Sequence, residues 1–141
     1  MPALERGMAK SGRSRADFQV SFPAFIVSGT SEEEMAAAVQ GTKQQIAFYG
    51  STPAYKGVFE LHGWDDLQPE LNRLSKQGDW VKMGELIDDE VLDAFAVVGE
   101  PEEIPGKIQA RVGDVVDRVS FYTPYASDPA RWGKVLAAFK G

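Results

Sequence analysis

The chain contains one histidine, His62, which is followed by a glycine and by Trp64. Its imidazole could act as an acid, a base or a donor to a substrate, or it could be a structural or surface group. The densest acidic cluster spans residues 88–90, with Asp93 one turn further on. These carboxylates could bind a hard cation, but the cluster lacks the glycine-bearing loop of a calcium site. We interpret it as a solvated helix face and predict no metal site.

Aromatic side chains gather in one short stretch that also contains Gly50 and Pro53. They are Phe48, Tyr49, Tyr55, Phe59 and Trp64. Aromatic residues beside such loops often line a pocket for a flat ligand. An ordinary patch of hydrophobic core would have the same composition, and the sequence leaves both readings open.

A second aromatic group follows the strand expected near the C-terminus. Tyr122 and Tyr125 lie at or just beyond the end of that strand, and Phe121 lies within it. Ligands of parallel α/β folds bind at the carboxyl ends of the strands. Tyr122 and Tyr125 are therefore better site candidates than Phe121, whose side chain could face the core.

Composition excludes several kinds of function. The 141 residues carry a net charge of −6, which argues against nucleic-acid binding and against docking on anionic lipid. There are no cysteines, so thiolate catalysis and cysteine-ligated metals are excluded. The Gly-x-Gly-x-x-Gly, P-loop and Gly-x-Ser-x-Gly patterns are absent. No apolar run is long enough to span a membrane and residues 1–15 lack a signal-peptide core, so we expect a cytoplasmic protein.

The elements that must position these residues follow a βαβα order. Strands are expected at 18–27 and 114–122, from alternating or continuous apolar residues. Helices are expected at 3–11, 31–49, 67–77, 80–95, 101–113 and from Pro129 onward, whereas 55–62 could be helical or extended and 94–98 could be a short extended segment. This order predicts an α/β fold with a parallel pair of strands.

Two strands make a poor sheet, because each leaves unpaired backbone groups at an edge. We therefore expect the chain to form a homo-oligomer through those edges or to be part of something larger. The length allows one domain, 1–141, whereas a complete eight-stranded α/β barrel needs about 250 residues.

Three stretches carry a resemblance to a known family. They are residues 47–55 with 60–64 (AFYGSTPAY and ELHGW), residues 89–99 with 101–103 (DEVLDAFAVVG and PEE), and residues 117–122 (DRVSFY). Together they resemble the C-terminal part of the bacterial luciferase-like oxidoreductases, and most closely the branch that uses the deazaflavin coenzyme F-420. The opening residues 4–14 resemble the helix and turn before a late barrel strand of that family.

The resemblance implies a partial TIM barrel, with 18–28 as its seventh strand, 114–122 as its eighth and a helical insert at 51–98. Members of the family transfer hydride to or from a flavin or deazaflavin at the barrel mouth, and some of them activate oxygen. By analogy, the cofactor is F-420, with FMN as the alternative. The residues that would border the coenzyme or a small-molecule substrate are Tyr49, Ser51, Tyr55, His62, Trp64, Tyr122 and Tyr125.

The earlier barrel strands, which carry much of the isoalloxazine contact in this family, have no counterpart here. A site that lacks the residues of these strands is not pre-organised to bind a flavin. We therefore expect weak or no catalysis from the lone chain, with an N-terminal barrel portion as its missing partner. The alternatives are a self-associating α/β module without catalysis and a small-molecule binder.

Overall fold

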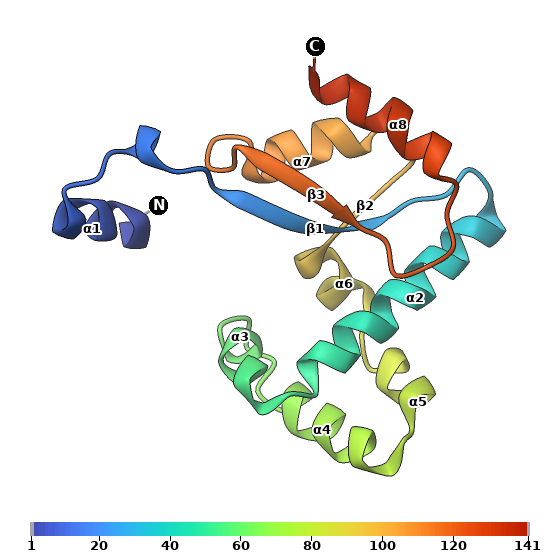
Figure 1. The fold of residues 1–141 in the computed structure, drawn as a ribbon. Coiled ribbons are helices and arrows are strands. Elements are labelled where there is room, and N and C mark those ends of the chain that lie inside the picture. The colour runs from blue at the N-terminus through green and yellow to red at the C-terminus, as the bar shows by residue number, and fades with distance from the viewer. Residues whose placement is uncertain (1, 141) are drawn as a thin grey trace.

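In a computed structural model that describes residues 2–140, the chain forms a small parallel sheet between two layers of helices (Figure 1). The strands are β1 (Ser21–Val27), β2 (Ala96–Val98) and β3 (Arg118–Tyr122). The α-helices are α1 (Pro2–Ser11), α2 (Glu32–Gly50), α3 (Lys56–Glu60), α4 (Leu67–Gln77), α5 (Trp80–Glu85), α6 (Asp89–Phe95), α7 (Ile104–Val112) and α8 (Pro129–Ala137). The 3-10 turns are η1 (Arg15–Asp17), η2 (Pro53–Tyr55) and η3 (Ala138–Lys140).

The sheet has the order β2-β1-β3, and both pairs are parallel. The two strands expected from the sequence therefore lie side by side, although both are shorter than the expected ranges 18–27 and 114–122. The third strand, β2, pairs with the other edge of β1, with Phe25 opposite Ala96. It confirms the extended alternative for the last three residues of 94–98, whereas 94 and 95 belong to α6, and it corrects the count of two strands.

Side chains of β1 alternate between two hydrophobic clusters. Val27 belongs to the cluster beneath the sheet, where α2, α4, α5 and α6 pack. Ala24 and Ile26 belong to the cluster above it, together with residues of α7 and α8. Both sheet faces are thus covered, as expected for a strand that is apolar on both sides. In a complete barrel the helices form only an outer ring, so this unit departs from that pattern by covering its second face with α7 and α8.

The start of α2 is fixed by an N-cap at Ser31. The sequence allows two capping-box registers, Thr30 with Glu33 or Ser31 with Glu34. In the structure the Oγ atom of Ser31 accepts a hydrogen bond from the Glu34 N–H at 3.2 Å, as the second register predicts, but the Glu34 carboxylate accepts from the N–H of Thr30, one residue before the N-cap.

The helix expected over 80–95 is wrong, because the chain forms two helices there. Asp88 caps the second one, its Oδ1 atom accepting from the Val91 N–H at 2.9 Å. Ile87, in the break between α5 and α6, is 1% exposed, so the bend buries a side chain that a straight helix would place elsewhere. The helical part of the expected insert 51–98 ends at Phe95, since residues 96–98 form β2.

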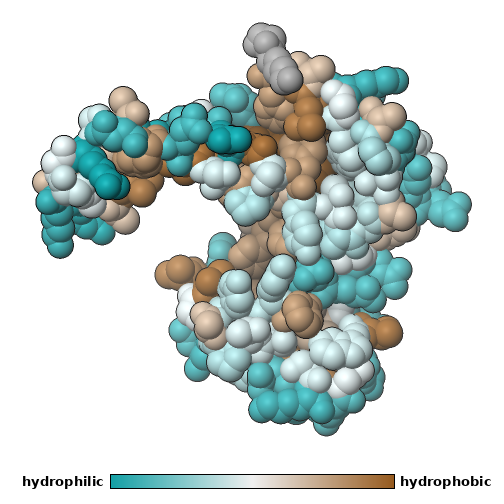
Figure 2. Space-filling model, in the orientation of Figure 1, coloured by the Kyte–Doolittle hydropathy of each residue, from teal (hydrophilic) through white to brown (hydrophobic). Residues whose placement is uncertain are grey.

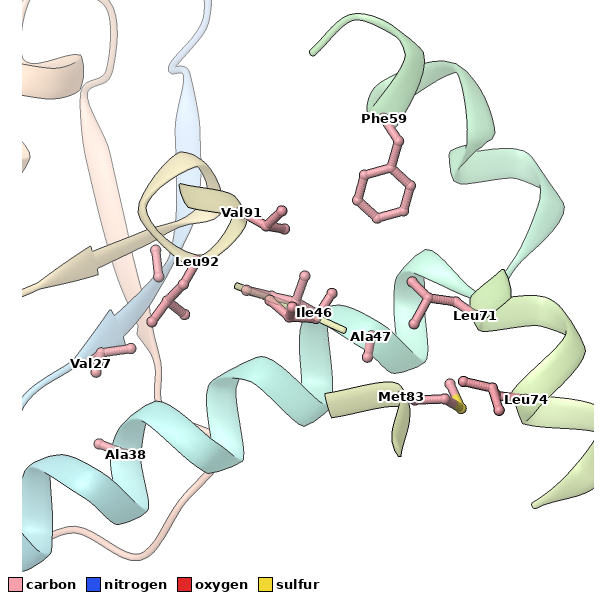
Figure 3. Packing of buried hydrophobic residues seen from close by; sticks show 12 residues of the cluster. Val27, Ala38, Ile46, Ala47, Phe59, Leu71, Leu74, Met83, Val91 and Leu92 are labelled. Carbon is pink, nitrogen blue, oxygen red and sulfur yellow. The ribbon is translucent and has the colours of Figure 1, made fainter. Parts of the chain in front are cut away.

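Helices α3, α4 and α5 pack around the C-terminal half of α2 (Figure 3). Phe59 points from α3 toward Ile46 and Leu71, and Met83 of α5 lies beside Leu74 of α4. Gly50 ends α2 directly against Phe59, and a Cβ atom at Gly50 would lie 2.6 Å from the Phe59 ring. The absence of a side chain at residue 50 therefore sets how closely α3 approaches α2.

Helix α1 stands apart from this body as an arm (Figure 1), and none of its residues is buried. Gly12, at φ +66°, ends it in the left-handed conformation, and the Arg13 N–H donates to the Met8 carbonyl at 3.2 Å. Arg15 then donates to the Asp117 carboxylate at 2.5 Å, which ties η1 to the start of β3. In the described residues, no helix has the length and apolar character needed to cross a bilayer.

We expect Gly50→Ala to lower the free energy of unfolding by about 1–3 kcal/mol, because the added methyl group overpacks the Phe59 contact. Gly57→Ala is the matched control, since a Cβ atom at that helical position meets nothing within 4 Å. Urea denaturation of both variants measures the difference. Equal stability of the two variants would contradict the close approach of α3 to α2.

Candidate functional site

Three of the seven residues expected at a site converge on one pocket. Tyr49, Tyr55 and Tyr122 line a cavity of about 360 Å³ between β1 and α3. The remaining lining is apolar except for the backbone at Gly50: Pro23, Phe25, Ile46, Val58, Phe59 and Phe95. We call this cavity the aromatic pocket. It is large enough for a flat ring system and offers few polar partners other than phenol hydroxyls.

The walls of the aromatic pocket come from separate elements that the sheet register brings together. Phe25 of β1 lies opposite Tyr122 of β3, with ring centroids 5.0 Å apart. Tyr49 of α2 reaches Phe25 at 6.4 Å and Tyr55 of η2 at 6.2 Å. These tilted contacts hold the rings in a fixed arrangement.

The environment of Tyr122 favours its neutral phenol. A side-chain hydrogen bond with Tyr49, together with burial, raises the pKa of Tyr122 above its ordinary value of 10.0. Tyr49, Tyr55 and Tyr122 are each between 38% and 43% exposed, so the pocket opens to the surface along their edges. The arrangement can stack on and orient a ring, and it contains no carboxylate or imidazole that could exchange protons with one.

Ser51 has a structural position instead. Its Oγ atom donates to the Phe48 carbonyl at 2.7 Å. Its own carbonyl accepts from the side-chain amides of Gln68 and Asn72, at 3.1 and 2.9 Å. Ser51 therefore joins the end of α2 to α4 and does not line the aromatic pocket.

His62 and Trp64 lie behind one wall of the pocket. Their rings stack at 4.5 Å with an interplanar angle of 10°. Phe59 and Phe95, which line the pocket, also contact Trp64 at 6.3 and 6.1 Å. The histidine is exposed and is not part of the pocket lining.

Tyr125 is separated from the other tyrosines. Its hydroxyl donates to the Ile26 carbonyl at 2.9 Å and accepts from the Ser28 N–H at 3.1 Å. Burial raises the pKa of Tyr125. The residue thus satisfies backbone groups where β1 ends, which is a structural role.

The carboxyl ends of β1 and β2 open on a different and larger crevice of about 1020 Å³. None of the seven expected residues lines it. Its walls come from the β1–α2 turn, the face of α2, α5 and the turn after β2, including Thr30, Met35, Val39, Val81 and Glu100. Ligands of parallel α/β folds bind at the carboxyl ends of the strands, so the position of this crevice is itself typical of a binding site. From the sequence, this rule was applied only to the C-terminal strand and its tyrosines, and the crevice was missed.

Glu34 links this end of the sheet to α8. Its carboxylate accepts from the N–H and the hydroxyl of Thr30, both at 2.8 Å, and from Arg131 at 2.9 Å. The Thr30 backbone and side-chain hydrogen bonds, followed by Arg131, lower the pKa of Glu34 to about 2. No group of three or more metal-ligating side chains occurs within residues 2–140.

Five side chains of the pocket lining on strands or helices were not among the candidates from the sequence: Pro23, Phe25, Ile46, Val58 and Phe95. A usable signal exists for the first two, because period-two alternation places Pro23 and Phe25 on one face of β1. Phe95 gives no such signal, since its position depends on how α6 turns into β2.

The chain is similar to known proteins in both sequence and structure. A model of the luciferase-like monooxygenase family matches residues 1–118. An uncharacterized protein of Mycobacterium tuberculosis is 57% identical over 119 residues, covering 84% of this chain and 35% of its own length. The 5,10-methylenetetrahydromethanopterin reductase of Methanopyrus kandleri is 26% identical over 132 residues, covering 91% of this chain and 36% of its own length.

The chain also resembles part of a solved structure. The coenzyme F-420-dependent tetrahydromethanopterin reductase of Methanopyrus kandleri superimposes with a TM-score of 0.66 and 26% identity, over 84% of this chain and 33% of that one. The α/β class and the likeness to part of a TIM-barrel reductase are thereby confirmed. The chain spans about a third of the length of the relatives that it matches.

Because the pKa of Glu34 lies below its ordinary value of 4.5, its contribution to stability is present above that value and is lost as the pH falls toward 2. We expect the urea midpoint of the native chain to fall more steeply between pH 5 and pH 2 than that of Glu34→Gln. Glu33→Gln, an exposed change in the same helical turn, should follow the native profile. Parallel profiles for all three proteins would contradict the hydrogen-bonded carboxylate.

Proposed function

The chain belongs to the luciferase-like monooxygenase family, and from that premise we propose that it forms part of the coenzyme site of a deazaflavin-dependent oxidoreductase. The observation that carries the proposal is the convergence of Tyr49, Tyr55, Tyr122 and Phe25 on the aromatic pocket. Relatives described as coenzyme F-420-dependent support the choice of cofactor. FMN, which also has a flat tricyclic ring, is the alternative.

The side chains that line the aromatic pocket fit the flat ring of such a coenzyme. Its surface is mostly apolar, and about 360 Å³ is at the lower end of the volumes typical of ligand pockets. When bound, a deazaflavin accepts or donates a hydride at its ring. The phenol edges of Tyr49 and Tyr122 would orient the ring, and Phe25 and Phe59 would keep water from one of its faces.

We propose that residues 51–95 serve as the helical wall of this site. They contribute Tyr55, Val58, Phe59 and Phe95 to the lining. The lining contains no carboxylate or imidazole, so a proton donor or acceptor that works near neutral pH and the second face of the ring would come from another part of the enzyme. On this proposal the lone chain binds the ring and a small-molecule substrate weakly and catalyses little.

The experiment is a fluorescence titration of the chain with coenzyme F-420 and, in parallel, with FMN. We expect saturable binding of one of them, and we expect Tyr55→Ala to raise Kd about three- to tenfold through loss of a stacking contact. Phe48→Ala is the matched control, because Phe48 is 52% exposed and lies outside the pocket lining.

Two results would count against the proposal. One is the absence of saturable binding of either coenzyme to a sample whose circular dichroism shows folded protein. The other is an equal rise in Kd for Tyr55→Ala and Phe48→Ala, which would place the bound ring outside the aromatic pocket.

A further inference from the structure

The junction between α6 and β2 determines where one wall of the aromatic pocket lies. Phe95, the last residue of α6, lines the pocket, and Ala96 begins β2 with an extended backbone at φ −117° and ψ 158°. The pocket opens to the surface, and Figure 2 shows the molecule hollowed between α1 and the lower helices, with hydrophobic surface inside the hollow. A ring at the wall of an open pocket is not packed from every side, so its position depends on what holds the backbone that carries it.

One side chain holds the backbone on both sides of Phe95. The guanidinium of Arg111 donates through Nη1 to the Ala96 carbonyl at 2.7 Å. Its Nη2 atom donates to the carbonyls of Asp93 and Ala94, the second at 3.2 Å. The last carbonyls of a helix have no partner within the helix, and a cation there also meets the negative end of the helix dipole. Within residues 2–140, no other side chain donates to these three carbonyls.

Helix α7, which carries Arg111, is itself fixed against the sheet. Ile104 and Ile108 are 0% and 2% exposed in the cluster above the sheet. The carbonyls that Arg111 binds belong to α6, beneath the sheet, and to the outer strand β2. The guanidinium therefore connects the two helical layers, and the planar fork of arginine has enough donors to serve several carbonyls at once.

Phe95 connects the α6–β2 junction to the other aromatic rings. Its ring meets Phe59 edge-on, with centroids 5.9 Å apart at 81°, and Trp64 at 6.1 Å and 65°. It also meets the His62 ring at 5.8 Å and 68°. Edge-to-face contacts depend on the orientation of the rings, so a displaced Phe95 would change the surroundings of all three.

We propose that Arg111 is a positioning residue for the ring-binding site, acting through the α6–β2 junction and Phe95. Arg111 is not part of the pocket lining, so any effect on a bound ring must pass through another residue. The effect on coenzyme affinity rests on the proposed function, whereas the position of the Phe95 ring can be measured without a ligand.

Lys107 provides a matched control on the same helix. It lies one turn before Arg111, and its Nζ atom donates to the Val98 carbonyl at 2.8 Å and to Glu103 at 3.1 Å. It therefore binds the end of β2 that is remote from Phe95. Arg111→Gln and Lys107→Gln each remove one positive charge from α7 and a side-chain contact with β2, so the two variants differ in which end of the strand they release.

The single histidine gives a test that needs no coenzyme. Because His62 is the one imidazole of the 141 residues, its ring C–H signals are unique in a proton–carbon NMR spectrum. The stack on Trp64 and the edge of Phe95 shift these signals. At one fixed pH, we expect Arg111→Gln to move them toward the signals of the urea-unfolded chain and Lys107→Gln to leave them at the native position. Native signals in both variants, or equal displacement in both, would overturn the positioning role.

The second measurement is the affinity for coenzyme F-420 or FMN, using the one that binds the native chain. We expect Arg111→Gln to raise Kd about three- to tenfold and Lys107→Gln to leave Kd unchanged. Phe95→Leu completes a double-mutant cycle. In that background Arg111→Gln should raise Kd no further, because the ring through which Arg111 acts is absent. An equal rise in Kd with and without Phe95 would overturn the action through Phe95.

Circular dichroism shows whether each variant is folded. If Arg111→Gln does not fold, Arg111→Lys decides, because lysine keeps the charge at the end of α6 but has its donors on a single nitrogen. A displaced His62 signal in folded Arg111→Lys supports the positioning role, and a native signal overturns it. If neither coenzyme binds the native chain, the proposed function fails, while the His62 signals still decide whether Arg111 positions Phe95.

Discussion

Strand β1 needs neighbours on both edges and cover on both faces, and the rest of the fold meets this need. Its residues alternate between two clusters, with Val27 in one and Ala24 and Ile26 in the other. Each of these three side chains is at most 1% exposed. The apolar surface they remove from water is the main favourable term in folding. Strands β2 and β3 pair with its two edges because a buried backbone cannot leave its N–H and C=O groups unpaired.

The position of β1 in the middle of the sheet explains where the two cavities lie. The chain leaves β1 for β2 through the helices on one face, and returns from β2 to β3 across the other face through α7. Opposite directions on opposite faces give both connections the same hand. The carboxyl ends of β1 and β2 then part around the large crevice, and the aromatic pocket forms on the face covered by α2 and α3.

Much of this arrangement could be predicted from local patterns. The alternation through Phe22 and Ala24 and the acidic first turn of α2 specify a strand followed by a helix without reference to the rest of the chain. The break between α5 and α6 at Asp88 was harder to predict, because the apolar side chains of residues 80–95 keep a helical spacing on both sides of it. Asp88 favours a cap over a helix interior only when Ile87 has a core to enter. The pairing of β2 with β1 is also non-local, since Ile26 and its partner Val97 are 71 positions apart in the sequence. No periodicity encodes such a contact.

The same contrast holds for the candidate site. Tyr49 and Tyr55 are neighbours in sequence and their shared pocket follows from the end of α2, but Tyr122 joins them only through its register opposite Phe25. His62 looked reactive because it is the one imidazole, yet its stack on Trp64 leaves it behind the wall made by Phe59 and Phe95. Residue type indicated which side chains could line a pocket, and the sheet register decided that Tyr122 joins Tyr49 and Tyr55 there. A pocket built in this way offers shape and stacking surfaces, and its lining contains no carboxylate, imidazole or amine.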